Sequence, residues 1–278
     1  MTALLAVPNV SEGRDEAAIE AIGAAFASTG VRLLDVHADP DHHRSVFTLA
    51  AEPGRLAPAL AAGAREVLAR VDLTAPRGAH PHVGALDVAP VVHLGPELRG
   101  AACAEALVAA DVLGELGLPV YLYGALAGGR SRAELRRPGA LDEVPSDFGP
   151  RERSPRHGAV LVAARPPLVA FNLELAPPAT VSDAKRIAAL VREGGEEGLP
   201  GVRALGIELR GGVAQVSTNV EDHVAVPLAR VLEAVRRHAR VREAELVGLA
   251  PAAAFDGWPE DVGVRNRRTV EDALRGLQ

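Results

Sequence analysis

Cysteine, lysine and aromatic residues are scarce in this sequence. Its single cysteine, Cys103, excludes an internal disulfide and a Cys-x-x-Cys metal site, and this fits a reducing compartment, so we expect the cytoplasm. Its single lysine, Lys185, leaves a Schiff-base mechanism with one candidate nucleophile. With 3% aromatic residues and a formal net charge of −6, the chain has few base-stacking side chains and no basic excess. We therefore predict no nucleic-acid partner.

Long apolar runs are also missing. No stretch of 18 or more apolar residues occurs, and the N-terminal sequence M-T-A-L-L-A-V-P lacks the basic start of a signal peptide. We therefore expect a soluble protein that neither enters a membrane nor is exported.

The chain does contain enough hydrophobic sequence, 48% of its 278 residues, for one large core or two smaller ones. Its C-terminal part has an apolar pattern that predicts, in order, a strand at 168–175, a helix from Ser182 to Glu193, strands at 202–210 and 213–220, a helix from Pro227 to Arg240 and a strand at 244–250. Residues 4–94 repeat this βαββαβ order, which is that of ferredoxin-like α/β sandwiches. We predict an α+β fold with two such subdomains, residues 1–167 and 168–278, and a ligand site in the crevice between them.

The stretch R-G-A-H-P-H-V-G at 77–84 predicts a stiff polar loop before an apolar, β-branched strand from Leu86 to Leu94. A loop braced by proline and glycine can hold an imidazole within hydrogen-bonding reach of a substrate, and imidazole titrates nearest neutrality. His80 and His82 are therefore the first candidates for acid–base catalysis. The alternative is a turn with two solvated histidines. Asp87, inside the strand, either orients one of these histidines or caps a turn.

The turn D-P-D-H-H-R at 39–44 concentrates acid, imidazole and guanidinium groups, and three interpretations stay open. It is a plain hairpin tip, a metal site of the kind found in metal-dependent phosphoesterases, or a substrate-binding turn. In the last case Arg44 clamps a carboxylate and the aspartates orient an amine.

Two further polar segments are ambiguous. Gln215, Ser217 and Asn219 share one face of a strand, and the pattern favours a solvated sheet face. The segment 128–156 is irregular and rich in Gly, Pro and Arg, and with G-P-R-E-R-S-P-R-H-G at 149–158 it is either an anion-binding loop or a surface loop.

Eight motifs occur in the order in which they stand in one family. They are V-P-N-V-S-E-G at 7–13, L-L-D-V and D-P-D-H-H-R-S-V-F-T-L within 33–49, H-P-H-V-G-A-L-D-V at 80–88, L-P-V-Y-L-Y-G at 118–124, D-F-G-P at 147–150, A-F-N-L at 170–173, Q-V-S-T-N at 215–219 and E-L-V-G-L-A-P at 245–251. Together they span nearly the whole chain, which resembles the formiminotransferase domain of glutamate formimidoyltransferases.

The resemblance implies an enzyme of histidine breakdown that transfers a one-carbon group, the formimidoyl group, from N-formimidoyl-L-glutamate to N5 of tetrahydrofolate. It also implies two α/β subdomains with the folate in a tunnel between them, a homodimer, tetrahydrofolate as co-substrate and no metal. The family's catalytic histidine matches His80. Its folate-contacting loop matches Gly149, Pro150, Arg151, Glu152, Arg153, Ser154, Pro155, Arg156, His157 and Gly158. To these we add Asp39 and Arg44 of the turn as substrate-binding residues.

The sequence departs from the family pattern in three places. His37 stands where some members have an aspartate thought to assist catalysis, so that role passes to Asp39 or is absent. His43 replaces the asparagine usual before Arg44. The segment 255–268 does not match the common C-terminal pattern, and no cyclodeaminase domain follows, so we expect a separate protein to carry out the deaminating step.

These departures keep two alternative functions open. One is a folate-binding relative without transferase activity. The other is a metal-dependent hydrolase built on the Asp39–His43 turn.

Overall fold

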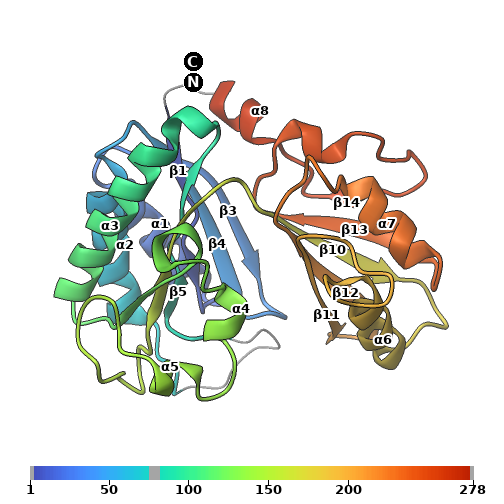
Figure 1. Cartoon of the computed structure of the whole chain (residues 1–278), viewed down its shortest axis with the longest axis horizontal. Helices are drawn as coiled ribbons and strands as arrows, with labels where there is room; N and C mark the ends of the chain where they lie inside the picture. Colours follow the sequence, from blue (N-terminus) through green and yellow to red (C-terminus); the bar gives the residue numbers. More distant parts are fainter. Residues whose placement is uncertain (1–2, 75–81, 276–278) are drawn as a thin grey trace. The chain divides into compact units, whose positions relative to one another are not determined.

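The computed structural model describes residues 3–74 and 82–275, which form two compact units, Met1–Pro166 and Pro167–Gln278 (Figure 1). Each unit is a mixed α+β structure with a β-sheet and a hydrophobic core of its own. Within the described part of the chain, no helix is long and apolar enough to cross a membrane.

The first unit is built on a nine-stranded sheet. Its strands are β1 (Leu4–Ala6), β2 (Asn9–Val10), β3 (Arg32–Asp39), β4 (Arg44–Ala51), β5 (Leu86–Val88), β6 (Val91–His93), β7 (Val120–Leu122), β8 (Val160–Val162) and β9 (Ala164–Arg165). The order is β7-β8-β5-β2-β4-β1-β6-β9, with β3 paired to β4. β5 and β8 are parallel neighbours, so the loops that precede them meet at one edge of the sheet.

Two predicted strands of this sheet are interrupted. The sequence predicts continuous strands at 86–94 and 159–165, which is wrong: each divides into two, β5 and β6 at Ala89–Pro90 and β8 and β9 at Ala163. Proline has no N–H to give to the ladder, which is why Pro90 falls at a break. The backbone still pairs across it, because Val7 N donates to Pro90 O at 3.1 Å and Val91 N to Ala163 O at 2.8 Å.

Three long helices pack on this sheet: α1 (Glu16–Ala27), α2 (Leu56–Arg70) and α3 (Arg99–Glu115) (Figure 1). Asp15 starts α1 because its side chain accepts the Ala18 N–H at 3.0 Å. Ile19, Ile22 and Phe26 then recur on one face of the helix, and all three are buried. The ring of Phe26 lies 5.2 Å from that of Phe47 on β4, which couples helix to sheet.

Short helical turns occupy the segment that the sequence predicts to be irregular. They are α4 (Arg132–Leu135) and α5 (Ala140–Glu143). Two further turns lie outside that segment: η1 (Pro96–Leu98), just before α3, and η2 (Gly124–Ala127), just before the segment begins. Ser131 and Glu134 form a reciprocal capping box that starts α4.

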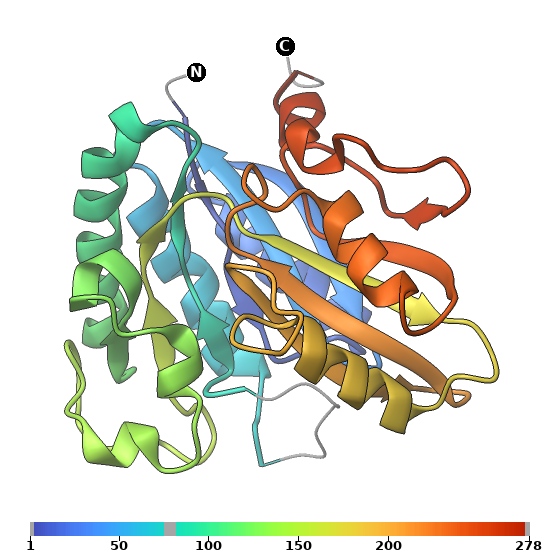
Figure 2. The same ribbon diagram turned by 45° about the vertical axis from the view of Figure 1, so that its right-hand side comes forward.

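The second unit has a five-stranded sheet with the order β11-β12-β10-β13-β14. Its elements are β10 (Val169–Leu175), α6 (Val181–Val191), β11 (Val202–Leu209), β12 (Val213–Val220), α7 (Leu228–Arg236), β13 (Val241–Val247), η3 (Ala252–Phe255), β14 (Val264–Arg265) and α8 (Val270–Arg275). Figure 2 shows α6 and α7, in gold and orange, on the same side of this sheet. Phe171 lies in the core between Phe255 and Trp258, so the segment that departs from the family pattern is part of the core.

Candidate functional site

The predicted catalytic residue His80 lies outside the described residues, but both ends of its segment are described. Before it, Leu73 N donates to Arg156 O at 3.0 Å. After it, Ala85 N donates to His157 O at 2.9 Å, and Val83 O accepts from Ala159 N at 3.0 Å. The structure thus attaches both flanks of the 75–81 segment to the end of the 149–158 loop.

Two glycines allow this attachment. Gly84 and Gly158 face each other in an isolated bridge. A Cβ on Gly84 would stand 1.8 Å from Ala159 O, and one on Gly158 would stand 2.2 Å from Val83 O. Gly158 also has φ +67°, in the left-handed region that disfavours other residues. At this point the two chain segments approach more closely than any side chain permits.

The 149–158 loop ends in a tight turn on Ser154. Ser154 O accepts from Gly158 N at 2.7 Å and from His157 N at 3.2 Å. The loop's arginines differ in their partners: Arg153 pairs with Asp142, and Arg156 lies 3.4 Å from Asp72. Arg151 is exposed, and its side chain makes no hydrogen bond or ion pair with the described residues.

Asp87, directly after these flanks, is the buried centre of an ion-pair cluster. Its side chain has 0% exposure. One oxygen, Oδ1, accepts the Val83 N–H at 2.8 Å. The other, Oδ2, accepts from Arg44 Nη1 at 2.8 Å and from Arg136 Nη2. Asp87 therefore ties the end of the His80 segment to two arginines. Its bond to the Val83 N–H agrees with the interpretation of Asp87 as the cap of a turn, and its role as a histidine orienter stays a prediction.

Arg44, predicted as a substrate clamp, is held on two sides. Its Nε and Nη2 donate to Asn9 Oδ1 at 2.9 and 2.7 Å, while Nη1 donates to Asp87. Burial lowers the pKa of Arg44 to about 10; Asp87 opposes this shift, and the positive charges of Arg136 and Arg132 add to it. The site thus contains more guanidinium charge than the one carboxylate balances.

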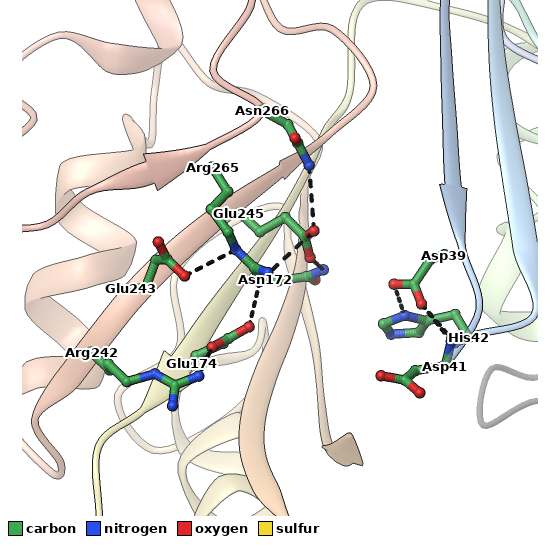
Figure 3. Close-up of polar contacts among 10 residues, drawn as sticks. All are labelled: Asp39, Asp41, His42, Asn172, Glu174, Arg242, Glu243, Glu245, Arg265 and Asn266. Carbon is green, nitrogen blue, oxygen red and sulfur yellow. Dashed lines mark hydrogen bonds and ion pairs between the residues drawn. The ribbon is translucent and has the colours of Figure 1, made fainter. Parts of the chain in front are cut away.

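The Asp39–His43 turn is stabilised by its own aspartate (Figure 3). Asp39 Oδ1 accepts the backbone N–H groups of Asp41 and His42 at 2.8 and 2.9 Å, and Oδ2 accepts from His42 Nδ1. Burial by itself raises the pKa of Asp39, but the hydrogen bonds from the side chain and backbone of His42 outweigh it and lower this pKa to about 2. His43, in the position usual for asparagine, has φ +51°, which suits asparagine and, less well, histidine.

A metal site is not formed by the described residues, since no group of three or more His, Cys, Asp or Glu side chains among them is arranged to hold an ion.

The second unit has a polar network on its sheet (Figure 3). Glu174, 4% exposed, accepts from Arg242 and Arg265, and Arg265 Nε lies 3.0 Å from Glu243 Oε2. Asn172 Nδ2 donates to Glu245 Oε2 at 3.2 Å.

The predicted solvated face is wrong for Gln215, which has 0% exposure and pairs in register with Glu174. Neither amide atom of Gln215 has a hydrogen-bond partner among the described residues.

Comparison with known proteins identifies the family. The profile of the formiminotransferase domain, N-terminal subdomain, matches residues 3–165, and that of the formiminotransferase domain matches residues 170–256. The chain therefore belongs to the formiminotransferase domain family.

Named relatives agree with this assignment. A glutamate formimidoyltransferase of Streptococcus pyogenes serotype M1 is 34% identical over 90% of this chain and 89% of its own. That of Thermoplasma acidophilum is also 34% identical, over 92% and 90%. The formimidoyltransferase-cyclodeaminase of Mus musculus is 37% identical over 90% of this chain, which spans about half (50%) of the mouse protein's length. A solved microcompartment protein from Desulfitobacterium hafniense DCB aligns with a TM-score of 0.26 at 11% identity, which is too low to inform the fold.

Sequence reasoning singled out the two loops as candidates but missed three groups: Arg136, which pairs with Asp87, Arg132, which interacts electrostatically with both, and Tyr123, which interacts with Arg132. All three lie in or beside the segment described from the sequence as irregular. The one local signal was the S-x-x-E pattern of Ser131 and Glu134, which marks a helix start.

Proposed function

We propose that this protein is a glutamate formimidoyltransferase, which transfers the formimidoyl group from N-formimidoyl-L-glutamate to N5 of tetrahydrofolate. Family membership and the two relatives of matching length support this. The structural observation that supports it best is the attachment of the 149–158 loop to both flanks of the His80 segment. The segments that the resemblance assigns to folate and to catalysis are thereby joined.

The proposed chemistry is acid–base catalysis by His80. N5 of tetrahydrofolate attacks the amidine carbon, a C–N bond forms, and N5 loses a proton. The bond from that carbon to the glutamate nitrogen then breaks, and this nitrogen gains a proton as it leaves. One imidazole can accept the first proton and donate the second, so neither an oxidant nor a reductant is needed.

Asp87 supports this assignment by fixing where the His80 segment ends. It accepts the N–H of Val83, three residues after His80. The described end of the segment assigned to catalysis is thereby bonded to the Asp87 cluster, while the placement of His80 itself stays a prediction.

We assign folate binding to the Gly149–Gly158 loop. Because Arg153 and Arg156 already pair with Asp142 and Asp72, Arg151 is the arginine best able to meet a folate carboxylate. Arg151→Ala should weaken tetrahydrofolate binding about ten- to a hundredfold, the range expected for one charge-assisted hydrogen bond. Binding titrations with tetrahydrofolate measure this, with Arg153→Ala as the comparison. Equal affinity in parent and Arg151→Ala would move the contact to another residue.

The same proposal covers the fold and the assembly. Both units have the same order of neighbouring strands. In the second unit it is β11-β12-β10-β13. In the first it is β3, then β4, then the interrupted pair β1 and β2, then the interrupted pair β5 and β6. This order supports two ferredoxin-like subdomains, 1–167 and 168–278. The ligand tunnel, the homodimer and the cytoplasmic location stay predictions.

The test is the reaction itself. Parent protein should form 5-formimidoyltetrahydrofolate from the two substrates, with a rate that depends on an ionisation near neutrality. His80→Ala should lower kcat about 10²- to 10⁴-fold and remove that pH dependence, while His82→Ala should do much less. A parent that binds tetrahydrofolate without turnover would indicate the inactive relative, and activity lost with chelator and restored by a divalent ion would indicate the hydrolase.

A further inference from the structure

The arginine cluster around Asp87 contains more positive charge than its structural role requires. Arg44 and Arg136 both donate to Asp87 Oδ2. Arg132 and Arg165 add two guanidiniums, and Arg132 interacts electrostatically with Arg136, Arg165 and Asp87. The guanidiniums of Arg44, Arg136 and Arg132 thus share one carboxylate, and the charge of Arg165 acts on Arg132.

Among the residues that the structure describes, none forms an ion pair with Arg132. Its side chain also makes no hydrogen bond to them, although it is partly buried. Burial lowers its pKa, Tyr123 opposes this, and the charges of Arg136 and Arg165 lower it further. A guanidinium that is withdrawn from water and crowded by like charges is costly unless an anion joins it.

Three hydrogen-bond donors around Arg132 are also unused. The Tyr123 hydroxyl is buried without a partner in the described structure, in a residue only 7% exposed. Arg136 Nε and Arg165 Nε are buried and unpaired in the same way. Buried donors in native proteins are normally satisfied, so unused donors together with excess positive charge indicate a ligand that accepts hydrogen bonds and is negatively charged.

We propose that Arg132, with Tyr123, Arg136 and Arg165, binds a glutamyl carboxylate, and that this is the α-carboxylate of the formimidoylglutamate donor. This inference rests on the proposed function. Two carboxylate sources exist, the donor and the glutamate tail of folate. The donor's α-carboxylate is bonded to the carbon that carries the reacting nitrogen, whereas the folate tail is separated from N5 by the aminobenzoyl group.

The position of the cluster favours the donor. Asp87 binds Arg136 on one oxygen and Val83 on the other, and Val83 is three residues from His80. A carboxylate held here would bring the leaving nitrogen to the described end of the segment that the proposed function makes catalytic, and such positioning accelerates a bound reaction.

Steady-state kinetics with each substrate varied in turn test the assignment. Arg132→Gln should raise KM for formimidoylglutamate about ten- to a hundredfold and leave KM for tetrahydrofolate unchanged. Tyr123→Phe, which removes only a hydroxyl, should raise the donor KM roughly two- to tenfold. Arg137→Gln is the matched control, because Arg137 is exposed on the same segment.

A binding measurement separates this inference from the proposed function. Calorimetric titration with L-glutamate, the released product, should show binding to the parent and to Arg137→Gln, and none to Arg132→Gln at the same concentrations. Thermal unfolding should show Arg132→Gln to be at least as stable as the parent, because the change removes an unpaired cation.

The outcomes are distinct. Parent turnover with an unchanged donor KM in Arg132→Gln overturns the inference and leaves the function standing. A raised KM for tetrahydrofolate instead of the donor assigns the cluster to the folate tail and also overturns it. The third outcome is a parent that binds glutamate but has no transferase activity, together with an Arg132→Gln variant that does not bind glutamate. This result supports the carboxylate site and overturns the proposed function.

Discussion

Asp87 carries the buried negative charge that pairs with two arginines of the first unit. It is fully buried and is paired with the guanidiniums of Arg44 and Arg136. Asp87→Asn keeps the shape but removes the charge, so two buried cations lose their counter-ion. We expect the free energy of unfolding to fall by about 3–5 kcal/mol, measured by denaturant unfolding.

Asp142→Asn is the control for this substitution. Asp142 pairs with Arg153 while 69% exposed, and an exposed pair contributes less than about 1 kcal/mol. If both variants lost the same free energy of unfolding, burial would not be the reason why Asp87 stabilises the fold.

The Gly84–Gly158 approach gives a second prediction for a single residue. Gly158→Ala requires a left-handed alanine and places Cβ 2.2 Å from Val83 O. Gly211→Ala also requires left-handed backbone, at φ +81°, but meets nothing within 4 Å. We expect losses of about 1 kcal/mol for Gly211→Ala and about 3 kcal/mol for Gly158→Ala, because overpacking adds to the backbone strain. Similar melting temperatures for the two variants would contradict the close approach.

Among the elements, those with strong local patterns were predicted best. The helix predicted from Ser182 to Glu193 is α6, Val181–Val191, because Ile187 and Val191 recur on its buried face and Thr180 caps it. The helix predicted to end at Arg240 ends at Arg236, because the chain already enters β13 at Val241. Breaks such as that at Ala89–Pro90 depend on pairing with distant strands, which local periodicity does not encode.

The site shows the same division. The His80 segment and the 149–158 loop could be singled out locally, from histidine, proline, glycine and arginine content. Their attachment requires the parallel pairing of β5 with β8, about seventy residues apart in the chain. Arg136 reaches Asp87 across 49 positions, so nothing near either residue indicates the other.

The turn at the end of β3 should respond to acid through Asp39. Its pKa falls from 3.8 to about 2, so the carboxylate stabilises the fold fully above pH 4, and this contribution disappears as the pH falls from about 4 to about 2. Asp39→Asn should therefore unfold more easily than the parent by about 2 kcal/mol at pH 6, and most of this difference should be lost by pH 2, where the native carboxylate itself begins to be protonated. Urea titrations across this range measure it, and a difference independent of pH would exclude the carboxylate charge as the cause.

For the whole molecule, two separate cores predict two separable unfolding events. The single tryptophan, Trp258, packs 5.2 Å from Phe171 and donates Nε1–H to Val262 O at 2.9 Å, so its fluorescence reports on the second unit. Both tyrosines, Tyr121 and Tyr123, are buried in the first unit. In Asp87→Asn, the tyrosine signal should therefore change at lower denaturant than tryptophan emission. Coincident transitions would mean that the two units unfold as one.

The double attachment of the 75–81 segment also limits how this protein can be engineered. Leu73, Val83 and Ala85 bond to Arg156, Ala159 and His157, so each segment supplies backbone partners that the other needs. If only one of the two segments were replaced by that of a relative, the new segment would have to form its backbone hydrogen bonds with a partner segment of different sequence. In recombination between family members, residues 73–85 and 149–159 should therefore be exchanged together, although they are far apart in the sequence.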